Sequence, residues 1–298
     1  MMRFETRLQP NWDIRAACNF MFGGAGGGLL LTSAVMTWPE APGLTVAALA
    51  LSLVGLGLFC VWLEIGRPWR FINVFFHPHT SWMSREAGVA VVTFCLAAIA
   101  VASGSAVIAL LGGLSGLAFV FCQGRILQAS KGIPVWREPA IVHVIVSTGL
   151  CEGAAIFCGA QALAGRATLL SAALLGALVL ARAMSWRIYE RGLLVQWSPE
   201  GLAANLARNR AIVVGAGTLL PLVLLAIIAF PSAGVADPSS GWRAMVLPVA
   251  SVAALAAGWY TKWNLVTRAS HMQGYALATR IQRGRPKLTP PIVRGGYR

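Results

Sequence analysis

Charged residues are scarce in this sequence. Only 11% of the 298 residues are Asp, Glu, Lys or Arg, whereas a soluble domain carries about a quarter. Acidic residues are the rarest, since 10 of them stand against 24 lysines and arginines, and 57% of the chain is hydrophobic, with a mean hydropathy of +0.69. This composition excludes an ordinary water-soluble domain, and lipid is the expected solvent for most of the chain.

The net charge of +14 does not indicate nucleic-acid binding. That function needs a basic face on a soluble fold, whereas the basic residues here lie between long apolar runs. We expect membrane lipids with anionic head groups, or acidic protein surfaces, as partners, and no nucleic acid.

Clustered metal ligands are also missing. No C-x-x-C pair is present, so neither a disulfide framework nor a zinc or iron–sulfur site is predicted. Only His143 of the four histidines lies in a predicted span, which argues against a haem held by two histidines, and His77 and His79 have no third ligand nearby in the sequence. We therefore expect no haem or metal in this chain. The six cysteines fall inside or at the edges of apolar runs: Cys18, Cys60, Cys95, Cys122, Cys151 and Cys158.

Eight apolar runs are long enough to cross about 30 Å of hydrocarbon. The third and fourth are separated only around Gly104 and Ser105, and we interpret them as a tight hairpin because about 40 apolar residues cannot span once. The predicted fold is all-α: a single integral membrane domain over residues 1–298 that forms a bundle of eight transmembrane helices. The runs cover residues 17–37, 44–65, 88–103, 106–127, 141–163, 169–186, 211–230 and 245–265.

Lysine and arginine predict the orientation, because short loops rich in them stay cytoplasmic. Alternate connections, including one that contains Arg182, carry nearly all of these residues, and the opposite side carries only Arg166 and Arg243. Both termini are therefore expected in the cytoplasm, with basic ends at residues 1–16 and 268–298. The connection over residues 189–210, with a helix-start signal at Ser198-Pro199-Glu200, is expected to lie along the inner surface, where it could bind anionic lipid or an acidic subunit.

Three further features suit a membrane bundle. Trp12, Trp69, Trp82, Trp136 and Trp186 fall near the inner ends of the predicted helices and Trp38 and Trp242 near the outer ends, as in aromatic belts. Lys262 is most simply a snorkelling residue. The GGAGGG stretch at residues 23–28 favours close helix packing over a ligand site.

The connection between the second and third spans, residues 66–87, holds the densest polar cluster. A flat quinone ring needs an apolar slot with proton donors and acceptors at its two oxygens, and this mixture of aromatic, basic and protonatable side chains suits it. A basic loop that binds lipid phosphates is an equal alternative. The candidate proton-exchanging residues are Glu64, His77 and His79, and the candidate quinone-binding residues are Asn19, Arg67, Arg70, Trp82, Arg85 and Glu86.

Glu152 lies deep in the fifth predicted span. Ionisable groups are costly in hydrocarbon and call for a functional hypothesis. Glu152 either makes a structural hydrogen bond to a neighbouring helix or relays protons, and the sequence leaves both open.

Two segments resemble a known family. GRPWR (residues 66–70) followed by HTSWMSREA (79–87), together with KGIPVWREPAI (131–141), is similar to the membrane anchors of the DmsC/NrfD superfamily, which serve dimethyl sulfoxide reductase-type and polysulfide reductase-type enzymes. The segment at residues 11–31 also resembles anchors linked with phenylacetyl-CoA:acceptor oxidoreductase. The matching positions are Gly66-Arg67-Pro68, Ser81-Trp82 and Ser84-Arg85-Glu86.

The resemblance implies a set of partners. A ferredoxin-like iron–sulfur subunit and a molybdopterin catalytic subunit would dock on the anchor, which would pass electrons between them and menaquinone or ubiquinone. Charge places the motif loop inside, so we expect the catalytic partners on the cytoplasmic side of a bacterial or archaeal inner membrane. The rivals are a proton-coupled secondary transporter that uses Glu152 and a purely structural anchor. The chain itself is not expected to act on the partner's substrate.

Overall fold

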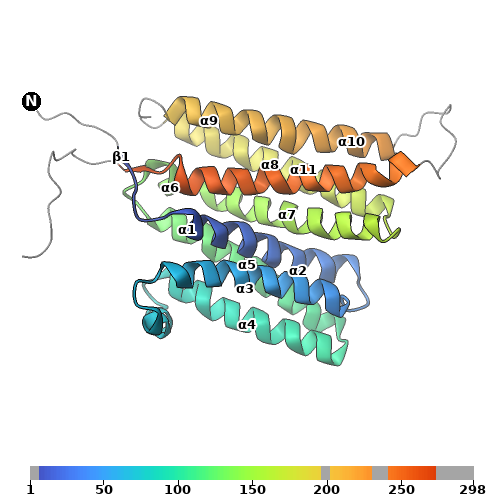
Figure 1. Cartoon of the computed structure of the whole chain (residues 1–298), viewed down its shortest axis with the longest axis horizontal. Helices are drawn as coiled ribbons and strands as arrows, with labels where there is room; N and C mark the ends of the chain where they lie inside the picture. The colour runs from blue at the N-terminus through green and yellow to red at the C-terminus, as the bar shows by residue number, and fades with distance from the viewer. Residues whose placement is uncertain (1–6, 196–201, 230–240, 273–298) are drawn as a thin grey trace, which may run out of the picture.

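The computed structural model describes residues 7–195, 202–229 and 241–272, and within these ranges the chain is almost entirely helical (Figure 1). Only β1 (Arg7–Leu8) and β2 (His271–Met272) pair as short antiparallel strands there. The helical segments are α1 (Ile14–Cys18), η1 (Asn19–Gly23), α2 (Gly24–Met36), α3 (Leu44–Glu64), η2 (Pro68–Phe76), α4 (Trp82–Ser103), α5 (Ala106–Ala129), α6 (Pro134–Arg137), α7 (Ile141–Leu163), α8 (Leu169–Val195), α9 (Leu202–Ala211), η3 (Ile212–Leu219), α10 (Leu220–Ala229) and α11 (Gly241–Thr267).

Seven helices within the described ranges are long and apolar enough to cross a membrane. The predicted polytopic helical membrane fold is thereby confirmed in outline. The eighth predicted span corresponds to α11, which is 27 residues long but is not among the seven and contains Pro248 and Lys262. The seven are Ile14–Met36, Leu44–Glu64, Trp82–Ser103, Ala106–Ala129, Ile141–Leu163, Leu169–Leu193 and Asn205–Ile228.

The predicted hairpin between α4 and α5 is present. Gly104 adopts a left-handed backbone conformation (φ 65°), which ends α4 without the steric cost that a side chain would impose. Ser105 then caps α5, because its hydroxyl accepts a hydrogen bond from the Ile108 amide. At the other end of α4, Ser81 caps the helix in the same way, and α4 begins at Trp82 rather than at the predicted Gly88. The connection is therefore shorter than residues 66–87.

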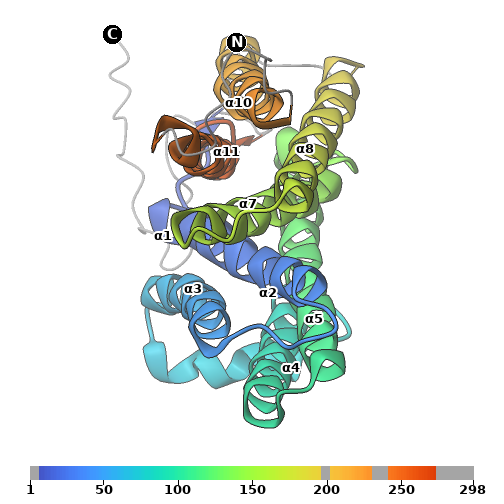
Figure 2. The ribbon, with the colours of Figure 1, turned by 90° about the vertical axis from the view of Figure 1, so that its right-hand side faces the viewer.

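Helices α2 and α7 pack side by side at the centre of the molecule. In Figure 2, α3, α4 and α5 lie on one side of this pair, and α8, α10 and α11 lie on the other. The glycines of α2 allow the close approach. A Cβ on Gly28 would overlap the carbonyl of Gly149, and a Cβ on Gly153 would overlap the backbone of Gly28 and Leu29. These contacts favour helix packing as the role of the glycine stretch.

Two basic residues lie deeper than the sequence predicts. Lys262 has no exposed surface, so the snorkelling interpretation is wrong. Arg182 was assigned to a cytoplasmic connection, but α8 continues to Val195 and buries it. Its guanidinium donates to the carbonyls of Ala254, at 2.6 Å, and Gly217. Gly217 belongs to η3, a π-helical segment. The arginine thus finds backbone acceptors inside the bundle, one on η3 and one on α11.

Other predictions about the surface are also corrected. Trp136 and Trp186 are 2% and 1% exposed, so they are core residues rather than members of an aromatic belt. Of the segment expected along the inner surface, residues 189–195 continue α8, residues 196–201 lie outside the described residues, and residues from 202 form α9, which runs without a break through η3 into α10. The helix-start signal at Ser198-Pro199-Glu200 and the basic tail from residue 273 onward lie outside the described residues.

Candidate functional site

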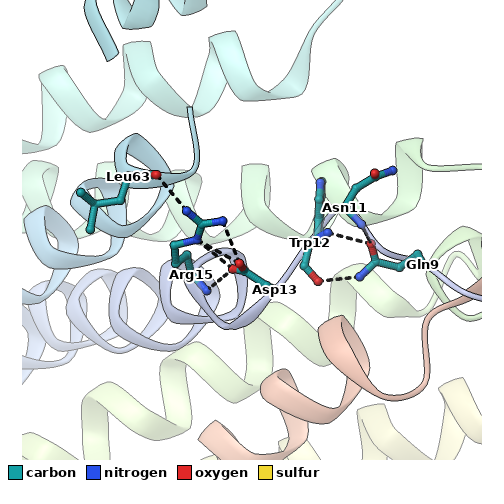
Figure 3. A network of polar contacts seen from close by, with 6 residues as sticks. All are labelled: Gln9, Asn11, Trp12, Asp13, Arg15 and Leu63. Atoms are coloured by element: carbon teal, nitrogen blue, oxygen red, sulfur yellow. Dashed lines mark hydrogen bonds and ion pairs between the residues drawn. The ribbon is translucent and has the colours of Figure 1, made fainter. Parts of the chain in front are cut away.

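The end of the bundle that carries η2 and the α3–α4 connection is called the motif end here, and it lies at the left in Figure 1. The chain before α1 is fixed at this end by polar contacts (Figure 3). Asp13 caps α1 by accepting a hydrogen bond from the Arg15 amide at 2.7 Å and forms an ion pair with the Arg15 guanidinium at 2.8 Å. Arg15 also donates to the carbonyl of Leu63 at 2.9 Å, which ties α1 to the end of α3.

The same contacts affect the ionisation of Asp13. The hydrogen bond from the Arg15 side chain lowers the pKa of the Asp13 carboxyl group below its usual value. A carboxyl group with a lowered pKa in the folded state stabilises the fold at neutral pH and loses that contribution as the pH falls through the lowered value. The cap on α1 is therefore at full strength at physiological pH.

Gln9 holds Trp12 in place. Its side-chain oxygen accepts hydrogen bonds from the amides of Asn11 (2.8 Å) and Trp12 (2.7 Å), and its side-chain nitrogen donates to the carbonyl of Trp12 (2.6 Å) (Figure 3). The same nitrogen also donates to the carbonyl of Val266 at 3.2 Å. The Trp12 ring lies 4.8 Å from that of Trp136, measured between centroids. Trp12 is thus fixed against α6 and the end of α11.

A cavity of about 140 Å³ lies beside Trp12 at the motif end. Its walls come from α1, η1, α3, α4 and α5, and most of them are apolar or aromatic. Three polar side chains reach it: Asn19, Glu64 and Glu86, all of them predicted site residues. The remaining lining residues are Trp12, Ala16, Phe20, Val61, Ile65, Met83 and Ile126.

The polar side of the cavity is a buried network. Asn19 begins η1, a π-helical segment of the kind often found at functional sites. Its side-chain amide donates to a Glu86 carboxylate oxygen at 3.0 Å. The side-chain amide of Gln123, on α5, donates to the backbone carbonyl of Asn19 at 2.8 Å. All three side chains are buried. The side-chain oxygens of Asn19 and Gln123 accept no hydrogen bond from any described residue. This buried network therefore holds the Glu86 carboxyl group and two acceptor oxygens without hydrogen-bond partners in an apolar setting, and Glu64 adds a second carboxyl group to the cavity.

A larger, basic groove of about 710 Å³ lies next to this cavity. Trp82 lines it, with the Arg85 guanidinium 4.1 Å and the Arg125 guanidinium 4.7 Å from its ring centroid. Such stacking holds the arginines over the aromatic ring. The groove joins residues 79–87 with residues 131–141, because Trp82 comes from the first segment and Lys131 and Arg137 from the second. Its lining residues are Trp82, Arg125, Gln128, Ala129, Lys131 and Arg137.

The other predicted site residues lie outside the cavity. His77, His79, Arg67 and Arg70 are exposed on the connection before α4. Arg85 donates from its guanidinium to the carbonyls of Pro78 (2.7 Å) and His79 (2.9 Å), so it shapes that connection. Among the residues that the structure describes, no three His, Cys, Asp or Glu side chains converge as a metal site would require.

Two participants were not predicted from the sequence. Gln123 joins Asn19 to α5, and its only sequence signal was a polar side chain inside an apolar run. The partner of Glu152 is Lys262, whose ammonium nitrogen lies 2.6 Å from a carboxylate oxygen, with both side chains 0% exposed. Glu152 thus has a polar partner on a neighbouring helix, Lys262 of α11. A pairing across 110 residues leaves no local pattern in the sequence.

Comparison with known proteins leaves the family open: no protein-family model matches this chain, and no curated protein matches it.

Proposed function

We propose that this chain is the quinone-reactive membrane anchor of a molybdopterin and iron–sulfur oxidoreductase, and that the cavity beside Trp12 receives the quinone ring. The observation that carries the proposal is the convergence of Asn19, Glu64 and Glu86 in one otherwise apolar cavity. A quinone requires this combination, because its ring is apolar while its two oxygens exchange hydrogen bonds and protons.

The size of the cavity supports a single ring. Pockets that enclose drug-sized ligands have roughly 300–1,000 Å³, whereas this one has about 140 Å³. A ring-sized head group would fit there while its isoprenoid tail remained in lipid. Glu86 and Glu64 would exchange protons with the quinone oxygens, and the Asn19 side chain would orient the ring.

The proposed partners would dock at the motif end. The groove with Arg125, Lys131 and Arg137 offers positive charge next to the quinone cavity, as an acidic iron–sulfur subunit would require. An eight-span topology with α11 as the last span and both termini in the cytoplasm would place this groove inside the cell, as the basic connections predict. The exposed histidines His77 and His79 would pass protons between the cavity and water.

Replacing Glu86 with glutamine tests the pocket. The variant keeps the shape of the side chain but loses the carboxylate, and a hydrogen bond to a charged group contributes about 1.5 kcal/mol or more. We expect the full-length protein in lipid nanodiscs to bind a short-chain ubiquinone, whose head group is a single ring, about tenfold more weakly, as measured by equilibrium dialysis.

Two further variants complete this test. Glu40→Gln removes an exposed carboxylate between α2 and α3, whereas the cavity lies at the other end of α3. This variant is expected to leave binding unchanged. Ala16→Leu places a larger apolar side chain in the cavity wall and is expected to abolish binding. Equal affinity in the wild type, Glu86→Gln and Ala16→Leu would rule out this cavity as the quinone site.

The histidines are tested in the assembled enzyme. The double variant His77→Ala/His79→Ala is expected to lose quinol-dependent turnover and to keep the activity of the soluble subunits with an artificial dye, because only proton exchange with the quinone is impaired. Unchanged quinol turnover would remove both histidines from the mechanism.

A secondary transporter is the second candidate, because the buried Glu152–Lys262 pair is the kind of intramembrane charge that such proteins use. Copurification in mild detergent separates the candidates. A quinone-reactive anchor brings iron and molybdenum with it, whereas a transporter does not.

A further inference from the structure

The buried ion pair between Glu152 of α7 and Lys262 of α11 is packed on every side by described helices. Its second carboxylate oxygen, Glu152 Oε1, accepts no hydrogen bond from any described residue. A Cβ on Gly258 would come within 2.6 Å of that oxygen, and a Cβ on Gly24 would overlap the Lys262 ammonium. Glycine at both positions leaves room for the two charged groups.

The charges around the pair do not cancel. Arg182 of α8 interacts electrostatically with both members, and Cys151 is a further titratable neighbour, on α7. Two buried cations, Lys262 and Arg182, therefore share one buried anion, Glu152. Excess charge is expensive in an apolar interior. Release of one proton from the Lys262 ammonium removes this excess. Lys262 is then a neutral amine, and the charges of Glu152 and Arg182 cancel.

Polar groups lie between Lys262 and the cavity at the motif end, although no hydrogen bond joins Lys262 to Gln123 among the described residues. Lys262 and Gln123 both approach Gly24. A Cβ on Gly24 would overlap the Lys262 ammonium and would lie 3.5 Å from the side-chain oxygen of Gln123. Gln123 in turn donates to the Asn19 carbonyl and lies beside the Glu86 carboxyl group, which lines the cavity. Glu86 is the first carboxylate reached from Lys262 in this direction, and the groups named before it, Gly24, Gln123 and Asn19, are neutral.

We propose that Lys262 is a proton-exchange site inside the bundle, which releases its proton past Gln123 to Glu86 and so to the cavity, and takes it back by the same route. In each transfer the ammonium becomes an amine while the Glu86 carboxylate becomes a carboxylic acid, which then loses the proton to water at the motif end. No electrons are exchanged. The proposal does not depend on the cavity holding a quinone.

Lysine-selective ¹⁵N NMR of the full chain in lipid bilayers tests the proposal directly, because the sequence has only three lysines: Lys131, Lys262 and Lys287. The expected result is one side-chain signal that changes from ammonium to amine below a pH of about 10.4, the usual pKa of lysine in water. Lys262→Met assigns the signal by removing it. A Lys262 signal that stays an ammonium up to that pH would overturn the proposal and leave a structural ion pair.

The route is tested by exchange rates on the intact pair. In Gln123→Leu, hydrogen–deuterium exchange at the Lys262 nitrogen is expected to slow by about tenfold or more, since one polar step is replaced by an apolar one. Gln161→Leu is the matched control, because it removes the same amide at a half-buried position near the end of α7 and should leave the rate unchanged. Equal exchange rates in both variants would exclude the route through Gln123. The NMR titration and the exchange rates test the proton-exchange site alone. Their outcome does not depend on whether Glu86→Gln changes quinone binding.

Discussion

Replacing Glu152 with leucine is expected to lower the free energy of unfolding by about 3 to 5 kcal/mol, the cost of removing one member of a buried ion pair. The leucine leaves Lys262 and Arg182 buried without their shared anion. Thermal or denaturant unfolding of the full chain in detergent, followed by circular dichroism, measures the loss.

The double variant Glu152→Leu/Lys262→Met separates charge from packing. It removes the unpaired ammonium together with the carboxylate, so part of the lost stability should return, because buried pairs are replaced by apolar residues at little cost. Arg182 still lacks its anion in this variant, so recovery is expected to be incomplete. Glu40→Leu, at an exposed position, should change stability by less than about 0.5 kcal/mol. A double variant no more stable than Glu152→Leu would show that the lost stability comes from packing rather than from charge.

Replacing Gly153 with leucine is expected to prevent the native packing of α2 against α7. Even a Cβ at this position would overlap the backbone atoms of Gly28 and Leu29, and backbone cannot give way as the end of a flexible side chain can. Overpacking costs about 3 kcal/mol or more where the neighbours cannot move. We expect loss of the monodisperse peak in size-exclusion chromatography in detergent.

Gly88→Leu is the matched control for this variant. Gly88 also lies in a long apolar helix, α4, but a Cβ there meets nothing within 4 Å. The protein should remain folded with unchanged or slightly higher stability, because leucine is the better helix former. If both variants folded alike, the contact between α2 and α7 would not be essential to the bundle.

The helices could be predicted because hydrocarbon imposes a length and a composition on each span. The α4–α5 hairpin was predictable for the same reason, with Gly104 marking the turn. Helix ends were less accurate. Ser81 starts α4 earlier than hydropathy suggests, and α8 continues nine residues beyond Trp186 because its later turns, which include Tyr189 and Leu193, pack into the core.

The site was predictable only in part. Polar residues in or next to apolar runs identified Asn19, Glu64 and Glu86, which do share a cavity. The high number of His and Arg residues in the connection before α4 also led to its prediction as part of the site, but these side chains are exposed. The number of polar residues in a segment does not reveal which side chains turn inward. Lys262 and Arg182 could not be placed, since a basic residue near a helix end is equally compatible with lipid head groups and with a partner on a distant helix.

The hydrogen bonds of Gln9 have a thermodynamic consequence. Its side-chain nitrogen donates both to the carbonyl of Trp12, in the wall of the cavity, and to the carbonyl of Val266, one helical turn beyond Lys262. A molecule whose binding displaces Trp12 would therefore also strain the last helix, and a shift of that helix would alter the fit of the molecule. By reciprocity, occupancy of the cavity and the protonation of a lysine deep in the bundle would each change the equilibrium of the other by the same factor.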